Sequence, residues 1–370
     1  ELGAEVVKIE SRANLDFLRR VTLEPDPNLS WTFSVESRGQ KSVCLDLSTP
    51  RGRELALALC AKADVVIENN RGGVVRAQGL DDSSVRAVNS RDVYVACQGF
   101  GEGGPRAEAP SFGPLNASFA GLNYLWSDPR GPYPAATALN HPDHLAGKML
   151  AIAVLAALDH RRRTGRGQKI EMSQAESAAF LVGEFYLEEA LLGRPIGPRA
   201  NDVDYAAPHG VYPAAGEDRW LAIAVIGDDT FARFAETLGW SDAKRFATLE
   251  SRLEARRELD ERIAEWTRSR DAEAAAATLQ KAGISAMAVQ NGLDHRADAH
   301  LTERRALVAV DHPAIGEEWH AGNPIRLSRT PLVTTGAAPN LGAHTEEILT
   351  RDLGLSRAEI AALAESGVCR

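Results

Sequence analysis

The chain has 370 residues, of which 44% are hydrophobic and 25% charged, an ordinary composition that excludes a wholly disordered protein. Its 51 acidic residues outnumber 42 basic ones, giving a formal charge of −9 that argues against a nucleic-acid-binding protein, because such proteins need basic surface. This length accommodates two or three domains. The longest strongly apolar stretch, residues 149–158, is too short to cross a membrane, so we expect no membrane partner.

The first hundred residues predict alternating strands and helices. Strands are expected to end at Glu10 and to cover residues 42–47, 63–68 and 93–97, and helices to cover 50–60 and 83–88. This alternation predicts a parallel sheet with helices on both faces, which binds ligands beyond the carboxyl ends of its strands. Residues 2–10 read as the end of a helix, a glycine turn and a strand. Since an α/β domain seldom begins in this way, we expect a further strand and helix upstream.

A segment rich in Gly and Pro follows at residues 99–142, and loops of this length are usually functional. The strongest predicted helix then runs from Asp143 to about Arg161, and a second one covers residues 173–192. The Gly99–Gly104 segment formally matches G-x-G-x-x-G. Pro105 and Pro110 interrupt the helix that a dinucleotide site needs, so we expect either a substrate loop or a plain turn.

The pattern of predicted elements changes after about residue 200. Residues 211–213 and 220–225 predict a hairpin, charged helices follow over 231–281, and 284–289 predicts a strand. Helices are predicted at 345–353 and 357–365, in a final segment that we expect to return to the first domain. We therefore predict a large α/β domain formed by 1–200 plus 325–370 and a smaller α+β domain formed by 201–324.

Asp143 is the most informative carboxylate of the chain. It follows a proline and opens an apolar helix, where the helix dipole and free amides favour an ionised side chain. An ionised, positioned carboxylate can act as a nucleophile, and the alternative is an ordinary helix cap. His141 and His144 flank it and are either surface residues or a base for proton abstraction.

Other motifs, present or absent, indicate which kinds of site the chain could contain. The segment Glu-Asn-Asn-Arg-Gly-Gly-Val at 68–74 follows a strand, and its Asn and Arg side chains could hold phosphate or amide groups, unless it is an ordinary turn. The four cysteines form no Cys-x-x-Cys pair, so neither a zinc site nor a disulfide framework is predicted. Buried thiols suit a reducing, cytoplasmic location. No G-x-S-x-G or H-E-x-x-H motif supports a serine hydrolase or a zinc protease.

Several segments occur together, in this order, in one protein family. They are LGAEVVKIE at 2–10, RGQKS at 38–42, ADVVIEN at 63–69, GFG at 99–101, Asp143 with Gly147, RTGRGQ at 163–168, APHGVY at 207–212 and LSRAEI at 355–360. The chain resembles the family III CoA-transferases, which include formyl-CoA:oxalate and carnitine CoA-transferases and 2-methylacyl-CoA racemases. The resemblance covers essentially the whole chain, and the ordered set is specific although no single motif is decisive.

The resemblance implies that Asp143 is the catalytic aspartate. It would attack an acyl-CoA thioester to form a mixed anhydride, and the CoA thiolate would then form an aspartyl-CoA thioester that passes CoA to an acceptor carboxylate. Coenzyme A and acyl-CoA are therefore substrates, a carboxylic acid is the partner substrate, and no permanently bound cofactor or metal is expected. Backbone amides of the glycine-rich loops could stabilise the oxyanions.

The same resemblance implies the CoA-contacting residues. They are Arg38, Lys41, Asn69, Asn70, Arg71, Arg76, Gly99, Gly101 and Phe112. Three places depart from the family pattern. An Arg is common two to three residues before the following Gly, where Ala77 and Gln78 stand here, with Arg76 close by. Asn70 stands where an aromatic residue is common, and Phe112 stands where Tyr is common, so Phe112 can line the pocket without donating a hydrogen bond.

The resemblance also implies an interlocked homodimer whose large Rossmann-like domain is built from both termini. The racemase branch uses a His–Asp pair, with the His in a stretch matched here by residues 112–116, which contain none. We therefore favour CoA transfer over racemisation. Two alternatives stay open: a 2-methylacyl-CoA racemase using Asp143 with another base, and a non-catalytic CoA-binding module, perhaps half of a longer fused protein.

Overall fold

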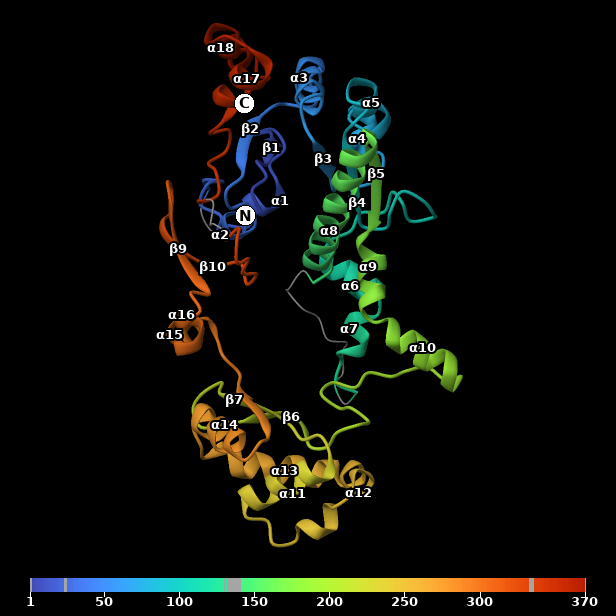
Figure 1. Ribbon diagram of the computed structural model, residues 1–370, viewed down its shortest axis with the longest axis vertical. Coiled ribbons are helices and arrows are strands. Elements are labelled where there is room, and N and C mark those ends of the chain that lie inside the picture. The colour runs from blue at the N-terminus through green and yellow to red at the C-terminus, as the bar shows by residue number, and fades with distance from the viewer. Residues whose placement is uncertain (1, 23–24, 130, 132–140, 333–335, 370) are drawn as a thin grey trace. The chain divides into compact units, whose positions relative to one another are not determined.

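The computed structural model describes residues 2–22, 25–129, 131, 141–332 and 336–369 (Figure 1). The chain divides into two compact units. The first comprises Glu1–Ala120, Leu139–Leu181 and Arg296–Arg370, and the second comprises Gly121–Ala138 and Val182–His295. The domain limits predicted from the sequence stay a prediction.

The first unit contains two parallel sheets. In one, β1 (Val7–Glu10) pairs with β2 (Lys41–Cys44); in the other, the order is β3 (Val65–Glu68), β4 (Val93–Gln98) and β5 (Gln168–Ser173). All neighbouring pairs are parallel, which confirms the predicted strand direction. The prediction missed β5, whose sequence QKIEMS is mainly polar, has only one buried residue and directly follows a glycine turn.

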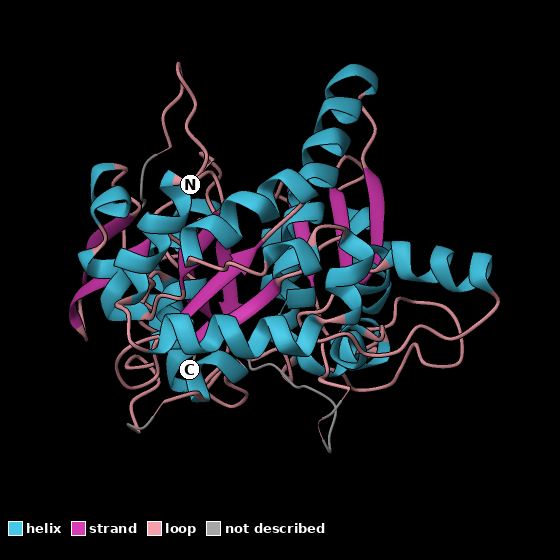
Figure 2. Cartoon of the chain, turned by 90° about the horizontal axis from the view of Figure 1, so that it is seen from below, coloured by secondary structure: helices cyan, strands magenta, loops and turns pink. Residues whose placement is uncertain are grey.

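Helices lie along these strands (Figure 2), and their limits follow from local signals. Helices α3 (Pro50–Cys60) and α5 (Asp82–Val88) begin at capping side chains, Thr49 and Asp81, that accept backbone N–H groups. The shorter helices of this part are α1 (Phe17–Arg20), α2 (Trp31–Glu36) and α4 (Val74–Ala77). The long helix α8 (His141–Thr164) covers β4 and β5, with Ala146, Leu150 and Ala157 buried against the strands.

The end of the chain packs against its beginning. Helices α17 (Thr345–Leu353) and α18 (Arg357–Glu365) have the limits predicted from the sequence, and Ile348 and Leu349 are buried with Val43 and Leu55 of β2 and α3. A buried ion pair reinforces this join.

In that ion pair, the Arg19 guanidinium of α1 donates to both carboxylate oxygens of Glu10 at 2.8 and 2.9 Å. It also donates to the carbonyl of Pro339 at 3.0 Å and lies 3.5 Å from the ring centroid of Phe33. Both charged side chains are almost fully buried, so each charge is stabilised by the other rather than by water. Residues far apart in the sequence are thereby held together next to the carboxyl end of β1.

The segment after residue 291 contains elements that the sequence analysis did not predict. They are the short helices α15 (Gly292–Ala297) and α16 (Ala299–Glu303) and an antiparallel hairpin of β9 (Leu307–His312) and β10 (Gly316–Ala321). Within the hairpin, His320 is buried and its Nε2 lies 2.9 Å from Glu318 Oε2. The charged and histidine residues of β9 and β10 obscure the alternation of apolar and polar residues that identifies a strand.

The second unit is a three-stranded antiparallel sheet covered by helices. The strands are β6 (His209–Pro213), β7 (Trp220–Ala224) and β8 (Ser285–Ala288), and the predicted hairpin is confirmed. The helices are α11 (Asp228–Leu238), α12 (Leu249–Glu254), α13 (Arg256–Arg268) and α14 (Ala272–Lys281). Leu221 and Ile223 of the sheet pack against Phe231, Leu259 and Leu279 of these helices.

Two predictions about local structure were wrong. The segment 99–142 was predicted as a loop, but α6 (Gly113–Phe119) and α7 (Leu122–Leu125) lie within it, while residues 130 and 132–140 are outside the described part. The single helix predicted at 173–192 is divided by Val182 into α9 (Gln174–Leu181) and α10 (Gly183–Leu192).

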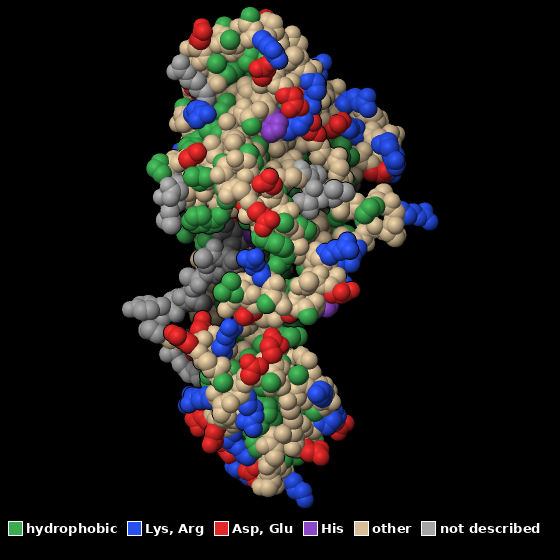
Figure 3. Space-filling model, turned by 90° about the vertical axis from the view of Figure 1, so that its left-hand side faces the viewer, with side chains coloured by type: hydrophobic (Ala, Val, Ile, Leu, Met, Phe, Trp, Pro, Cys, Tyr) green, Lys and Arg blue, Asp and Glu red, His purple; other side chains and the backbone are tan. Residues whose placement is uncertain are grey.

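Basic and acidic side chains are interspersed over the face drawn in Figure 3. Among the helices described, none combines the length and apolar character that a bilayer span requires. The described side chains also include no group of three or more His, Cys, Asp or Glu residues placed to hold a metal ion.

Candidate active site

The carboxyl ends of β3, β4 and β5 lie at one edge of their sheet. Because the three strands are parallel, the residues that follow them emerge side by side: Asn69 after β3, Gly99 after β4 and Gln174 after β5. Helix α8 contacts β4, β5 and α9, and it begins two residues before Asp143. This edge therefore assembles most of the residues that the sequence analysis selected.

The loop after β4 fits only because it contains glycine. A Cβ atom on Gly99 would lie 1.7 Å from Ser111 Oγ, and one on Gly101, whose φ is +76°, would lie 2.6 Å from Glu171 Oε1. Two backbone hydrogen bonds fix the loop. Ala175 N–H donates to the Gly99 carbonyl at 2.9 Å, and Glu102 N–H donates to Glu171 Oε1 at 2.9 Å. The loop is thus held directly on β5 and the start of α9.

Asp143 lies in the first turn of α8 and is half-buried. Burial is the main effect and raises the pKa of its carboxyl above the ordinary aspartate value. A backbone hydrogen bond, the nearby charge of His144 and a hydrogen bond from the Gln174 side chain oppose that shift. The carboxylate is therefore partly removed from water while several groups support its charged form.

A second loop, after β3, is shaped by a buried acid. Glu68 accepts hydrogen bonds from Asn70 N–H at 2.8 Å and from Gln98 Nε2 at 3.2 Å, and burial raises the pKa of its carboxyl. Gly72 allows the loop to pass close to the Ala107 carbonyl, which would lie 2.5 Å from a Cβ atom there. Residues 69–71 consequently stand exposed at the sheet edge, with their side chains available to a ligand.

Phe112 immediately precedes α6 and is 57% exposed. Its carbonyl accepts the N–H of Asn116 at 3.0 Å, and its ring centroid lies 5.3 Å from that of Phe17 in α1. The contact brings the first segment of the chain beside α6. An exposed aromatic ring at this place is a suitable wall for an apolar ligand chain.

Arg38, Lys41 and Arg76 occupy different surroundings. Arg38 follows α2, whose last residue, Glu36, is 3.9 Å from His144 Nε2, so this turn lies near the start of α8. Arg76 is exposed on α4. Lys41 is the first residue of β2, at the end opposite its carboxyl edge, and ion-pairs with Glu5 at 2.8 Å and Glu347 at 2.6 Å. The structure therefore does not bring Lys41 to the carboxyl edges of the strands.

Two residues at this edge escaped the sequence analysis. Gln174 is buried at the start of α9, and its Oε1 accepts a hydrogen bond from Asn116 Nδ2 at 2.9 Å. Neither residue stands in a recognisable motif. The RTGRGQ run followed by a strand would have placed Gln174 at a strand's carboxyl end, had β5 been predicted.

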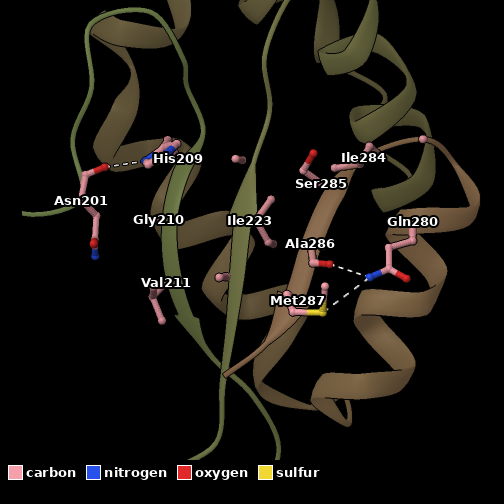
Figure 4. A pocket seen from close by; sticks show the side chains of 13 residues that line it. Asn201, His209, Gly210, Val211, Ile223, Gln280, Ile284, Ser285, Ala286 and Met287 are labelled. Carbon is pink, nitrogen blue, oxygen red and sulfur yellow. Dashed lines mark hydrogen bonds between the residues drawn. The ribbon is translucent and has the colours of Figure 1, made fainter. Parts of the chain in front are cut away.

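The second unit has a separate hollow of about 580 Å³ on the open face of its sheet. Figure 4 shows that Val211 and Met287 line it, together with His209, whose Nδ1 contacts the Asn201 carbonyl at 2.6 Å. Gln280 Nε2 donates to the Ala286 carbonyl at 2.7 Å along one side. The hollow is mainly apolar and lacks the paired titratable groups of a catalytic site.

The aspartate and the glycine-rich loops lie at the carboxyl edge of a parallel sheet, which is where open α/β sheets bind their ligands. The model of CoA-transferase family III matches residues 1–345, and the chain belongs to this family. It is a CoA-transferase.

Similar proteins support this membership. The chain is 30% identical over 366 residues to succinyl-CoA--D-citramalate CoA-transferase of Chloroflexus aurantiacus, covering 98% of this chain and 90% of that one. It is 28% identical to formyl-CoA:oxalate CoA-transferase of a Bradyrhizobium species, covering 99% and 91%. A crystal structure of a CAIB/BAIF family protein from Brucella suis superposes with a TM-score of 0.84 at 29% identity, covering 95% and 92%.

Proposed function

We propose that the protein transfers CoA from an acyl-CoA to a free carboxylic acid with Asp143 as its covalent nucleophile. The observation that supports this role is the position of Asp143: half-buried in the first turn of α8, at the carboxyl edge of β3–β4–β5, with donors around its carboxylate. A carboxylate in this setting is oriented and poorly hydrated, which favours attack on a thioester.

The proposed reaction begins when a carboxylate oxygen of Asp143 attacks the thioester carbonyl. A C–O bond forms, the C–S bond breaks, and CoA leaves as a thiolate beside a mixed anhydride. The thiolate sulfur then attacks Cγ of Asp143, and the anhydride C–O bond breaks to release the donor acid. Two further exchanges with the acceptor carboxylate regenerate Asp143 and yield the new acyl-CoA, so the sequence needs no ATP.

The exposed loops at this edge would hold the CoA thioester. Asn69, Asn70 and Arg71 offer amide and guanidinium groups for the nucleotide and pantetheine, and Arg38 and Arg76 are candidates for its phosphates. Backbone N–H groups beside Gly99 and Gly101 are candidates for the thioester oxyanion, and Phe112 for a wall of the acyl pocket. Because the named relatives act on succinyl-CoA and formyl-CoA, small acyl-CoA donors are the first to test.

We also propose that the working form is a homodimer. Within the first unit, Ile152 of α8 and Phe180 of α9 are 70% and 77% exposed. Within the second unit, Leu191 of α10 is 76% exposed. Large apolar side chains that are exposed to water together are typical of a surface that a partner covers.

The nucleophile is tested by Asp143→Asn. The substitution keeps the size of the side chain but replaces one carboxylate oxygen with an NH₂ group and removes the negative charge that makes the side chain nucleophilic. We expect CoA transfer from succinyl-CoA or formyl-CoA to fall by at least 1,000-fold, on the order of the loss of a catalytic nucleophile, while CoA binding measured by calorimetry is retained. Substantial transfer by this variant would contradict the role of Asp143.

A further inference from the structure

Gln174 and Asn116 form a buried amide pair next to Asp143. Asn116 is fully buried on α6, and Gln174 is 9% exposed at the start of α9. The two residues are 58 positions apart in the sequence, yet Asn116 Nδ2 donates to Gln174 Oε1 at 2.9 Å. Burying two primary amides is costly unless their hydrogen bonds are made, so this pair requires an explanation.

The pair fixes which end of the Gln174 amide faces Asp143. Since Oε1 is turned toward Asn116, the NH₂ group points the other way, where it is 3.9 Å from Cys97 Sγ. Cys97 packs with Ala146, which lies one turn after Asp143 on α8, so the NH₂ group faces the start of α8, and as a donor it lowers the pKa of the Asp143 carboxyl. A carboxylate can only accept, so the reversed amide would set two acceptors against each other. Asn116 Oδ1 is left without a partner among the described residues, so Asn116 contributes chiefly its donor.

The backbone around Gln174 is also fixed. Ser173 Oγ accepts the N–H of Glu176 at 3.2 Å, and the N–H of Ala175 donates to the Gly99 carbonyl. Gln174 thus extends from a capped helix start that is tied to the glycine loop. The amide is preorganised, as a donor must be if it is to stabilise a charge that develops during a reaction.

We propose that Gln174 is a catalytic hydrogen-bond donor to the Asp143 carboxyl oxygen, and that Asn116 positions it; the proposal rests on Asp143 being the nucleophile. When the CoA thiolate adds to Cγ of the mixed anhydride, a C–S bond forms and the electron pair of the Cγ=O bond moves onto the oxygen. The Gln174 N–H stabilises that oxyanion. Its collapse restores the C=O bond and breaks the anhydride C–O bond, which releases the donor carboxylate.

The test compares Gln174→Leu with Ser177→Ala. Leu fills similar space without a donor. Ser177→Ala removes a buried hydrogen bond, from Ser177 Oγ to the Gln174 carbonyl at 2.7 Å, one turn along the same helix, without changing the amide. We expect Gln174→Leu to lower kcat about 100-fold, the effect of losing one oxyanion donor. We also expect the acid limb of its kcat/KM to move to higher pH. Ser177→Ala should change neither.

A second variant tests the same role if Gln174→Leu does not fold. Asn116→Ala leaves Gln174 in place but frees its amide to rotate, so we expect a smaller loss of kcat and a shift of the acid limb in the same direction. Thermal unfolding verifies that each variant is folded. If folded Gln174→Leu matches Ser177→Ala in kcat and pH profile, Gln174 is not the donor.

The failure of this proposal is distinguishable from failure of the nucleophile. Hydroxylamine added during turnover labels Asp143 in the wild type if aspartyl intermediates form. A labelled wild type with an unaffected Gln174→Leu overturns the donor role alone. A wild type that transfers CoA without labelling at Asp143 overturns both.

Discussion

Asp143 illustrates how one side chain balances two opposing effects on its charge. Burial favours the protonated form, whereas the backbone N–H and Gln174 amide favour the carboxylate. Burial outweighs them, so the pKa of Asp143 is raised. A nucleophile with a raised pKa is less hydrated and also more basic, and both properties favour attack on an acyl carbon. The helix start therefore does more than cap α8.

This balance predicts the pH dependence of transfer. On the proposed mechanism Asp143 attacks only when it is ionised, and its pKa is raised, so kcat/KM should begin to fall at a pH above the ordinary aspartate value of about 4 as the solution is acidified. The check is a pH profile of kcat/KM with a donor that does not titrate in this range. An acid limb at or below the ordinary value would contradict the burial of the nucleophile.

Individual elements differ in how well the sequence predicts them. The hairpin β6–β7 and the helices α17 and α18 were correctly predicted, because their apolar spacing and turn residues are local signals. Strand β5 was not, since its pairing with the buried β4 stabilises it, although only one of its own residues is buried. Asp143 could be selected from the sequence because its proline and the apolar helix after it are adjacent to it. Gln174 could not, because its surroundings are made by the end of β5 and by Asn116 of a distant helix.

Helix α12 depends on a buried arginine. Arg252 is fully buried and donates to the carbonyls of Ala207, Phe246 and Ala247 at 2.7, 3.1 and 3.2 Å, and to Asp228 at 2.8 Å. Four acceptors from three separate segments of the second unit therefore share one side chain. Removing it leaves buried carbonyls unpaired, which costs more than the net value of each hydrogen bond.

We expect Arg252→Leu to lower the free energy of unfolding by about 2–6 kcal/mol, because the buried carbonyls of Ala207 and Phe246 lose their donor at about 1–3 kcal/mol each. The exposed Arg257, on α13, provides the matched control, and Arg257→Leu should change stability by no more than about 0.5 kcal/mol. Urea unfolding of both variants measures the difference. Equal stabilities would show that the Arg252 contacts contribute little.

For the whole molecule, the exposed apolar residues of each unit are the main unexplained feature of a single chain. If a second copy covers them, the protein should sediment at micromolar concentration with twice the mass of one chain. Phe180→Glu places a charge on a side chain that is 77% exposed in the monomer, so it should weaken the dimer without unfolding the chain. Sedimentation equilibrium of both proteins makes the comparison, and a wild type that is monomeric at this concentration would refute the dimer.

Trapping a covalent intermediate on Asp143 is the most direct test of how this CoA-transferase works. The protein is incubated with succinyl-CoA or formyl-CoA, hydroxylamine is added, and the tryptic peptide that contains Asp143 is weighed. The expected result is a hydroxamate on Asp143 that requires the acyl-CoA and is lost in Asp143→Asn. Active transfer with an unmodified Asp143 peptide would contradict an aspartyl intermediate.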